Sequence, residues 1–407
     1  MKEQLRIAII GLGNRGRTML KHEMVHMAKE DLTIVGLCDV YEERNQMSLE
    51  IMKKFDLPDP ELITTDYKEI LKMDLDAILI FTSWENHVNI ACEAMEAGIY
   101  CAVEVAGAYS IEDCWRLVRT YERTKTPLMM LENCCYGKRE LMVLEMVRKG
   151  LFGDVVYCSG GYCHDLRKEI VHGEENRHYR LRNYLSRNCE NYPTHELLPI
   201  GRVLNINFGN RFLSLTSTAS CAKGLARYCT DNLPEEHKMK HAEFKQGDIV
   251  TTVLKCANGE TVAITLDTSL PRAYSRGFTV RGTKGAYFED NDSIFLDDVH
   301  HKDYEFNGRP LWGNAAEYEK EYEHPLWKNY DGYGTHDGTD HLVLRAFFES
   351  VKAGLEPPID VYDTATYMAV TALSEQSISE GSTPQAFPDF TSGRWLQRKM
   401  PPNKYNL

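Results

Sequence analysis

The amino-acid sequence predicts an α/β protein with an N-terminal doubly wound parallel sheet and a C-terminal α+β domain with a mostly antiparallel open sheet. The chain has 407 residues, which is longer than a chain that folds around a single hydrophobic core usually is. Its first third alternates strand-like apolar runs with helical periodicity. Later, short alternating strands follow one another across tight turns, as in antiparallel sheets. We therefore expect domains at residues 1–135 and 136–370, and then, over residues 371–407, a helix end and tail that pack back on the fold.

The first predicted strand leads into a glycine-rich turn. The sequence LRIAIIGLGNRG is an apolar run followed by Gly11, Gly13 and Gly16 in the spacing G-x-G-x-x-G. A helical segment, RTMLKHEMVHMA, follows, and a second strand, LTIVGLCDV, ends in Asp39, 39 − 16 = 23 residues after the third glycine. This context is typical of a dinucleotide-binding Rossmann turn, in which the glycines allow a tight turn, close approach of a pyrophosphate and close helix packing. The alternative is a glycine-rich turn without a ligand.

The residues around this turn predict which dinucleotide binds. The pyrophosphate is expected at the helix N-terminus, beside Asn14 and Arg15, where free N–H groups and the helix dipole favour negative charge. Asp39 would accept hydrogen bonds from the ribose hydroxyls and repel a 2′-phosphate. The sequence therefore predicts NAD rather than NADP.

Three further segments continue the alternation of strands and helices. DAILIFTSWENHVNIACEAMEAG has the pattern strand, loop, helix; IYCAVEVAGAYSIEDCWRLVRTYERTK repeats it; and TPLMMLENCCYG adds a strand. Ligands of open parallel sheets bind at the carboxyl ends of the strands. The side chains at these ends are therefore expected near the dinucleotide: Thr82, Trp84, Asn86, His87, Glu104 and Glu132.

The second half of the chain has the pattern of an antiparallel sheet. DIVTTVLKCANGETVAITLDTS contains two alternating runs joined by Asn258-Gly259, a strong hairpin signal. GFTVRGTKGAYFED predicts another hairpin around GTKG, and DTATYMAVTALSEQSISEG predicts a final helix. Such a sheet can bury one face and leave the other open. An open face would suit a homo-oligomer.

Composition and charge exclude several classes of function. The net charge of −13 argues against nucleic-acid or anionic-membrane partners, which require basic patches. No apolar run approaches the roughly 18 residues that cross a bilayer, and the N-terminus enters a strand-like run too early for an export signal. Twelve cysteines without a C-x-x-C pair favour reduced thiols and no metal site. We expect a cytoplasmic protein with a small-molecule substrate.

A second set of candidate residues lies mostly beyond the dinucleotide domain. NYPTHELLP places Tyr192 and His195 at the start of a predicted helix, where an imidazole could act as acid or base. The plainer interpretation of this pair is helix capping and packing. Three further candidates also have plainer interpretations. The histidine at 164 could be a paired surface residue, Arg180 could belong to a solvated basic loop, and the tyrosine at 274 could be an aromatic residue at a strand end. The remaining members occur in GGYCHDLR, HYRLRNY, LPRAYSRG and LENCCYG: Tyr162, His164, Arg180, Tyr274 and Glu132.

Over essentially its whole length, the chain resembles the Gfo/Idh/MocA superfamily of Rossmann-fold oxidoreductases. Sugar and inositol dehydrogenases of that group carry a lysine after the glutamate that ends a strand, where this chain has VEVAGA, with Val105 after Glu104. A valine cannot move the alcohol proton. The Glu-Val pair and the ordered motifs above are similar to the NAD-dependent α-N-acetylgalactosaminidase branch, glycoside hydrolase family 109. In THELLP, Glu196 and Leu198 depart from the glycines usual in that family.

This resemblance implies an NAD-dependent glycoside hydrolase, α-N-acetylgalactosaminidase-like, acting on a small carbohydrate or glycoside. The family's reaction transiently oxidises sugar carbon 3, eliminates the glycosidic oxygen, adds water and re-reduces the sugar. The implied catalytic residues are His195, as base, Tyr192 and Tyr274. The implied substrate-binding residues are Glu132, Tyr162, His164 and Arg180. An NAD-dependent sugar or polyol oxidoreductase is the alternative, and a cofactor-binding sensor without turnover is the third possibility.

Overall fold

The computed structural model describes residues 4–300, 306–400 and 404–407. The chain divides into two compact units. The first unit comprises residues 1–136, 326–366 and 399–407, and the second comprises residues 137–325 and 367–398. The chain thus leaves the first unit at residue 136 and returns to it at residue 326. The returning segment lies within the second domain by sequence order, but by packing it groups with the first unit.

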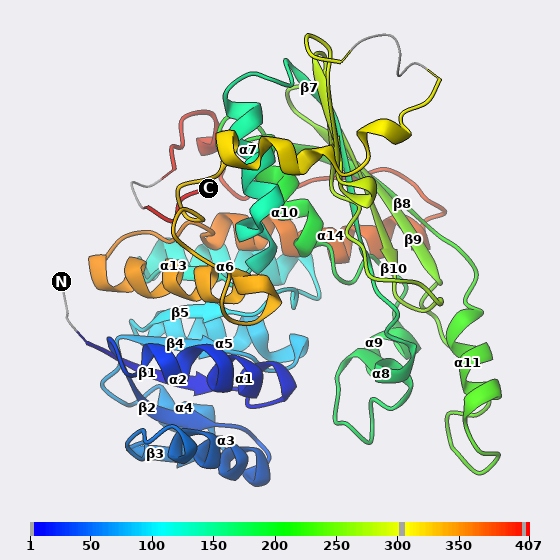
Figure 1. The fold of residues 1–407 in the computed structure, drawn as a ribbon. Coiled ribbons are helices and arrows are strands. Elements are labelled where there is room, and N and C mark those ends of the chain that lie inside the picture. The colour runs from blue at the N-terminus through cyan, green and yellow to red at the C-terminus, as the bar shows by residue number, and fades with distance from the viewer. Residues whose placement is uncertain (1–3, 301–305, 401–403) are drawn as a thin grey trace. The chain divides into compact units, whose positions relative to one another are not determined.

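A parallel sheet of six strands lies at the centre of the first unit (Figure 1). Its order is β3-β2-β1-β4-β5-β6, and all neighbouring strands pair in parallel. Every residue of β4 and β5 is buried, as expected for strands with both faces covered. The predicted doubly wound sheet is therefore confirmed. The strands are β1 (Leu5–Ile10), β2 (Leu32–Cys38), β3 (Leu62–Thr64), β4 (Ala77–Ile80), β5 (Tyr100–Val103) and β6 (Leu128–Met130).

Helices connect these strands as the periodicity predicted. The helix after the glycine turn contains a short π-helical stretch, η1. Ser110 is the N-cap of α6, and its hydroxyl accepts a hydrogen bond from the Asp113 N–H. This cap satisfies one of the free N–H groups of the first turn. The helices are α1 (Asn14–Met19), η1 (Leu20–Met24), α2 (Val25–Met27), α3 (Glu42–Lys54), α4 (Tyr67–Ile70), α5 (Trp84–Glu96), α6 (Ile111–Thr124) and the 3₁₀ turn η2 (Asn133–Tyr136).

The returning segment adds one long helix to the first unit, α13 (Thr339–Ala353). Phe347 of α13 meets Tyr100 of β5 edge to face, with ring centroids 5.4 Å apart. The Tyr100 hydroxyl donates to the Leu355 carbonyl at 3.1 Å. Such an aromatic pair contributes about 0.5–1.5 kcal/mol beyond its buried area. These contacts fix α13 in the core of the first unit, so the residues at its N-terminus also have a fixed place there.

The second unit is built on an eight-stranded sheet of order β13-β12-β11-β7-β10-β9-β8-β14. Strands β9 and β10 form the predicted hairpin, with Gly259 at φ +108°, and β11 and β12 form the second. All neighbours pair antiparallel except β7 and β10, so the mostly antiparallel sheet is confirmed. The strands are β7 (Val155–Cys163), β8 (Phe212–Ala219), β9 (Ile249–Cys256), β10 (Thr261–Asp267), β11 (Thr279–Gly282), β12 (Gly285–Phe288), β13 (Ser293–Leu296) and β14 (Gln385–Ala386).

One helix of the second unit, α10, contacts β7 closely. A Cβ added at Gly160 of β7 would lie 2.6 Å from Glu196 Cβ of α10, so a glycine is needed at this contact. The contact brings the start of α10 next to the carboxyl end of β7. The remaining helices are α7 (Lys138–Arg148), α8 (Arg167–Val171), α9 (Arg180–Ser186), α10 (Thr194–Val203), α11 (Gly224–Asn232), α12 (Glu319–Tyr322) and α14 (Val361–Ser379), the last of which contains the predicted final helix and crosses the division between the units.

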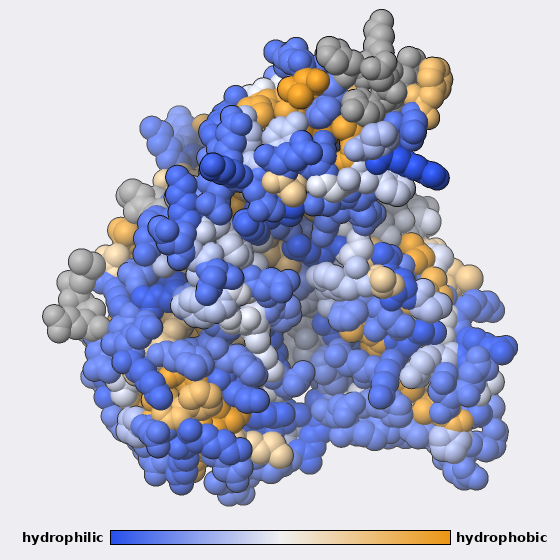
Figure 2. Space-filling model, viewed as in Figure 1, coloured by the Kyte–Doolittle hydropathy of each residue, from blue (hydrophilic) through white to orange (hydrophobic). Residues whose placement is uncertain are grey.

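The surface in view is mostly hydrophilic, with hydrophobic residues in small separate patches (Figure 2). Within the described ranges, no helix combines the length and the apolar character that a membrane span requires. None of the twelve cysteines forms a disulfide, and eleven of them are buried. The cysteines therefore serve as small apolar core residues.

Candidate functional site

Two glycines of the turn after β1 are required by the packing of the protein itself. Gly11 has φ +95°, and its N–H donates to the Cys38 carbonyl at 2.7 Å. A Cβ at Gly11 would lie 2.5 Å from the backbone of Phe81, and one at Gly16 would lie 2.1 Å from the Gly11 carbonyl oxygen. A side chain at either position would push β1, β4 and α1 apart.

Gly13 differs, because the space above it is open. An added Cβ would meet one atom within 4 Å, an Arg44 guanidinium nitrogen at 3.7 Å. Gly13 is the N-cap of α1 and offers no capping side chain, so the first N–H groups of α1 border this space. Packing therefore does not demand a glycine here, whereas a dinucleotide pyrophosphate does. The residues of this turn fit NAD.

Substitutions of Gly13 and Gly16 should separate cofactor binding from folding. We expect Gly13→Val to keep the melting temperature within about 2 °C of the wild type, a shift of less than about 1 kcal/mol, because its φ of −64° is ordinary. The isopropyl group should nevertheless weaken NAD binding at least about tenfold. Gly16→Ala should lower the melting temperature, because the alanine Cβ meets a backbone oxygen. Calorimetric titration with NAD and thermal unfolding check both variants; equal NAD affinity in Gly13→Val and wild type would contradict this interpretation.

Asp39 braces the turn from the end of β2. Its carboxylate accepts the N–H groups of Leu12 at 2.7 Å and Tyr41 at 3.0 Å. The Arg44 guanidinium lies 3.7 Å away. The aspartate is buried to 6% exposure, and its orientation is therefore set before any ligand binds. A carboxylate oxygen has more than one acceptor site, so the ribose hydroxyls can still be bound.

The ends of β4 and β5 are held together by His87 of α5. Its Nδ1 lies 3.0 Å from the Ala106 carbonyl oxygen, and its Nε2 lies 2.9 Å from that of Thr82. Burial lowers the pKa of His87. A Cβ at Gly107 would lie 2.6 Å from the same ring, so the loop after β5 closes directly over the imidazole. His87 therefore shapes the cofactor edge of the sheet, and the buried ring of Trp84 begins the same helix.

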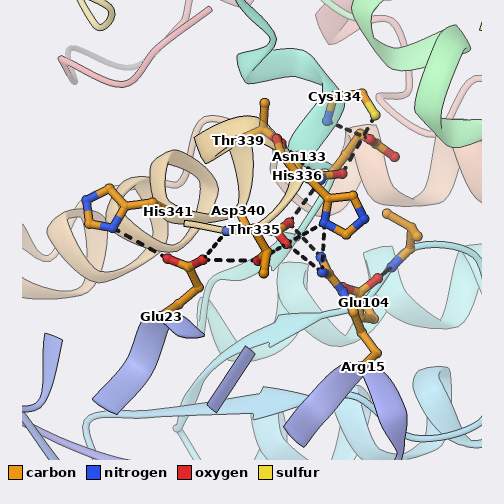
Figure 3. A network of polar contacts seen from close by, with 12 residues as sticks. Arg15, Glu23, Glu104, Asn133, Cys134, Thr335, His336, Thr339, Asp340 and His341 are labelled. Atoms are coloured by element: carbon orange, nitrogen blue, oxygen red, sulfur yellow. Dashed lines mark hydrogen bonds and ion pairs between the residues drawn. The ribbon is translucent and has the colours of Figure 1, made fainter. Parts of the chain in front are cut away.

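The half-buried guanidinium of Arg15 joins the buried carboxylates of Glu104 and of Asp340, a residue of the returning segment, in one ionic network (Figure 3). Arg15 extends from the first turn of α1, and Glu104 follows the last residue of β5. Asn133, which follows β6, donates to Asp340 as well. The sequence motifs predicted Arg15 and Glu104 as cofactor residues. They did not predict Asp340, because no local pattern relates a residue at position 340 to the glycine turn.

In the second unit, Tyr162, Tyr192 and His195 pack ring against ring. Tyr162 is the last residue but one of β7, and His195 lies in the first turn of α10. The ring centroids are 4.2 Å apart for Tyr162 and Tyr192, 4.9 Å for Tyr192 and His195, and 5.5 Å for Tyr162 and His195. Both tyrosines are nearly buried, and His195 is half-buried. The two motifs, separated by thirty positions, thus meet where α10 crosses β7.

Arg180 also belongs to this cluster. Its guanidinium carbon lies 4.8 Å from the Tyr192 ring centroid, and its Nε lies 3.1 Å from a Glu169 carboxylate oxygen. Arg180 is 7% exposed, whereas its sequence neighbours Arg177 and Arg182 are exposed. A solvated basic loop therefore describes its neighbours but not Arg180 itself.

His164 and Tyr274 extend the cluster toward solvent. The His164 ring centroid is 5.3 Å from that of Tyr274, and its Nδ1 is 3.4 Å from the Tyr162 hydroxyl. Burial, followed by the charge of Arg180, lowers the pKa of His164, which favours the neutral imidazole. Tyr274 is 53% exposed. Glu132, by contrast, belongs to the first unit, where its buried carboxylate accepts the Cys134 N–H at 3.0 Å.

A cavity of about 640 Å³ adjoins the cluster on the side of His164. Its volume is in the range of small-molecule pockets. Its lining is mostly polar and includes three acidic side chains and one lysine. The lining residues are His164, Asp165, Leu166, Lys168, Glu169, His172, Glu175 and Asn176.

Glu190, which directly precedes the NYPTH motif, is a titratable residue that sequence reasoning missed. It is fully buried, and one carboxylate oxygen accepts the Tyr192 N–H at 3.2 Å. Burial raises the pKa of Glu190 to about 8, against the weaker opposing effect of that hydrogen bond. At neutral pH a protonated carboxyl therefore lies under the backbone that carries Tyr192. The signal that could have identified Glu190 in the sequence was its position directly before NYPTH.

Glu190 should make folding stability depend on pH. Because its folded pKa is raised to about 8 and an unfolded glutamate titrates near 4.3, its stabilising contribution is full below about pH 4 and is lost as the pH rises toward 8. Glutamine cannot ionise. Glu190→Gln should therefore melt close to the wild type at pH 5 and at least about 2 °C above it at pH 8. Thermal unfolding at both pH values checks this, with the exposed Glu236→Gln as control; a gap that does not widen with pH would contradict it.

Comparison with known protein families gives one match for each part of the chain. The family described as "Oxidoreductase family, NAD-binding Rossmann fold" matches residues 5–131, and "Glycosyl hydrolase 109, C-terminal domain" matches residues 136–397. A glycosyl hydrolase family 109 protein of Stenotrophomonas maltophilia is 38% identical, with 97% of this chain and 91% of the relative covered. An alpha-N-acetylgalactosaminidase of Tannerella forsythia is 36% identical, with 97% and 88% covered.

Solved structures support the fold. A levoglucosan dehydrogenase in complex with NADH and L-sorbose has a TM-score of 0.69 at 15% identity, with 95% of this chain and 100% of that chain covered. The WlbA dehydrogenase of Bordetella pertussis, in complex with NADH and UDP-GlcNAcA, has a TM-score of 0.67 at 13% identity, with 95% and 99% covered. At such identities the likeness concerns the fold alone. From the two family matches and the relatives aligned over nearly its full length, the chain belongs to glycosyl hydrolase family 109 and is an NAD-dependent glycosidase.

Proposed function

We propose that the protein hydrolyses small α-N-acetylgalactosaminides or closely related glycosides, with Tyr192, His195 and Tyr274 as catalytic residues. The observation that carries this proposal is the cluster of phenol, imidazole and guanidinium groups around the start of α10, beside a cavity of about 640 Å³. A relative that is 36% identical bears the name alpha-N-acetylgalactosaminidase, which supports the choice of sugar.

The reaction requires a base, hydrogen-bond donors and a group to hold the sugar. NAD, when bound, supplies reversible oxidation at sugar carbon 3, which acidifies the proton on carbon 2. We assign the removal of that proton to His195, since an imidazole is the commonest general base in enzymes. Tyr192 and Tyr274 donate hydrogen bonds to sugar oxygens. Arg180, fixed by Glu169, holds a hydroxyl or the acetamide oxygen.

Tyr162, His164 and Glu132 complete the proposed substrate contacts. The neutral imidazole of His164 both donates and accepts hydrogen bonds, as sugar hydroxyl groups require. The nearly buried ring of Tyr162 supports Tyr192 from one side. Glu132 lies at the carboxyl end of β6, on the edge of the parallel sheet where ligands bind. Its fixed carboxylate suits a sugar hydroxyl.

The residue after Glu104 argues against the alternative, a sugar or polyol oxidoreductase. Val105 is buried, and its N–H donates to the Glu104 carboxylate at 2.9 Å. Its side chain has no group that can carry the proton of an alcohol during net oxidation. A hydrolase that restores its own cofactor does not require that group in the same place.

The proposal also covers the cellular compartment and the assembly state of the protein. Cysteines that form no disulfide support a reducing compartment, which we propose to be the cytoplasm. The open sheet of the second unit supports a homo-oligomer. Gel filtration with light scattering tests the assembly state, and a mass of about 47 kDa, the monomer mass, would contradict the oligomer.

A panel of p-nitrophenyl glycosides tests the reaction. The purified protein is incubated with each glycoside, and nitrophenolate and NADH are followed separately by absorbance. We expect nitrophenolate from the α-N-acetylgalactosaminide without net NADH, because the cofactor ends in its original state. Net NADH from the free sugar without release of nitrophenolate would favour the oxidoreductase. Cofactor binding with neither signal would favour a sensor.

A further inference from the structure

The returning segment brings a fully buried carboxylate to the arginine of the glycine turn. Asp340 lies in the first turn of α13 and has no exposed surface. Its two oxygens accept the two terminal nitrogens of the Arg15 guanidinium at 2.7 Å and 2.8 Å. A bidentate pair of this kind fixes both the position and the plane of the guanidinium.

Three more donors surround the same carboxylate. Asn133 Nδ2 donates at 2.9 Å and the Thr335 hydroxyl at 2.6 Å, and His336 Nδ1 lies at 2.6 Å. Burial acts to raise the pKa of Asp340, but the hydrogen bonds from Arg15 and His336 outweigh it and hold that pKa well below its usual range. Asp340 is therefore an ionised carboxylate, and the groups around it compensate its buried charge.

Arg15 is held from its other side by Glu104. The Arg15 Nε donates to one Glu104 oxygen at 2.7 Å, while the other Glu104 oxygen accepts the Val105 N–H. The guanidinium thus bridges one carboxylate at the end of β5 and one at the start of α13 (Figure 3). A long arginine side chain is thereby ordered without a ligand.

The position of this bridge in the sheet identifies the part of the dinucleotide that it serves. The acidic residue at the end of β2, Asp39, marks the adenosine ribose, and the pyrophosphate crosses at the N-terminus of α1. The other half of the dinucleotide must extend over the ends of β4, β5 and β6. Glu104 and Asn133 follow β5 and β6, so the bridge lies at the nicotinamide end.

We propose that Asp340 is a positioning residue of the NAD site, which holds Arg15 against Glu104 before the dinucleotide binds. The returning segment is then a part of the cofactor site. Binding to a site whose long side chains are already ordered avoids the entropy loss of ordering them. In the opposite role, Asp340 would compete with the pyrophosphate of the dinucleotide for Arg15 and so weaken NAD binding.

Asp340→Asn tests the proposal, with Asp31→Asn as the matched control. Asp31 also pairs with α13, through Arg345 at 2.9 Å and through Lys352, but it precedes β2 and lies away from the carboxyl ends of the strands. On cofactor-free protein, calorimetric titration should give an NAD dissociation constant about tenfold higher for Asp340→Asn, a change of about 1.4 kcal/mol. The control should remain within about twofold of the wild type. Unchanged or tighter binding by Asp340→Asn would overturn the proposal.

A double-mutant cycle separates positioning through Arg15 from general damage. If Asp340 acts through Arg15, Arg15→Ala should itself weaken NAD binding about tenfold. The double variant Arg15→Ala/Asp340→Asn, which removes both charges of the Arg15–Asp340 pair, should bind no more weakly than Arg15→Ala. These two variants decide the question even if Asp340→Asn alone does not fold. Wild-type affinity in Arg15→Ala, or weaker binding in the double variant, would contradict the proposal. The readout is dinucleotide binding, so either result leaves the proposed hydrolysis untouched.

Discussion

Replacing His195 with alanine is expected to lower the rate of glycoside hydrolysis by about 10²–10⁴-fold, the usual contribution of a general base. His195 is the half-buried imidazole that packs against both Tyr162 and Tyr192. Alanine leaves no proton acceptor in its place. NAD affinity should stay within about twofold of the wild type, because His195 is not one of the residues assigned to the dinucleotide. Nitrophenolate release and calorimetric titration with NAD measure the two quantities.

A matched histidine shows whether this effect is specific. His241 is an exposed histidine of the same unit that pairs with Glu235, and His241→Ala should keep full activity. His164→Ala should reduce activity less than His195→Ala if His164 binds substrate and does not remove the proton. Retention of more than half of the wild-type rate by His195→Ala would remove His195 from the proposed role.

Replacing Asp39 with asparagine is expected to reduce the preference for NAD over NADP at least about tenfold. A unit charge a few Å from the 2′-phosphate contributes about 1–4 kcal/mol, depending on screening. Asparagine keeps an acceptor oxygen for one of the two N–H groups that Asp39 holds but loses the repulsion. Arg44, 3.7 Å from the carboxylate, is then available to the phosphate. Dissociation constants for both dinucleotides measure the ratio.

The position of the charge can be tested with a second aspartate. Asp66 follows β3, the strand next to β2, and caps α4 by accepting the Lys68 N–H. Asp66→Asn should leave the ratio unchanged. Adding Arg44→Ala to Asp39→Asn should remove most of the gain in NADP affinity. An unchanged ratio in Asp39→Asn would show that Asp39 does not face the ribose.

The fold could be predicted wherever its signals were local. The glycine turn, the strand that leads to Asp39 and the Asn258-Gly259 hairpin follow from residues close together in sequence. The structure confirms all three, with the strand ending at Cys38, directly before Asp39. The parallel pairing of β7 with β10 could not be predicted, since it joins segments about a hundred residues apart. The return of residues 326–366 to the first unit has the same cause, because only contacts such as Phe347 with Tyr100 determine where α13 packs.

For the candidate site, too, residues in local motifs could be predicted, whereas residues brought in by packing could not. Motifs identified Tyr162, Tyr192 and His195, and the structure shows that they are in contact, although their chemical roles stay predictions. The sequence alone could not distinguish Arg180 from the exposed arginines around it, since burial depends on Tyr192 and Glu169. Likewise, Asp340 becomes a candidate only when packing places it against Arg15.

The most direct test of the account is hydrolysis of an α-N-acetylgalactosaminide in heavy water. The proposed reaction removes the proton from carbon 2 of the sugar and later returns one from solvent. The released sugar should therefore carry deuterium at carbon 2 in nearly every molecule, as measured by proton NMR and mass spectrometry. Complete hydrolysis without deuterium at carbon 2 would instead indicate direct displacement by carboxylates, and would contradict a role for NAD in the chemistry.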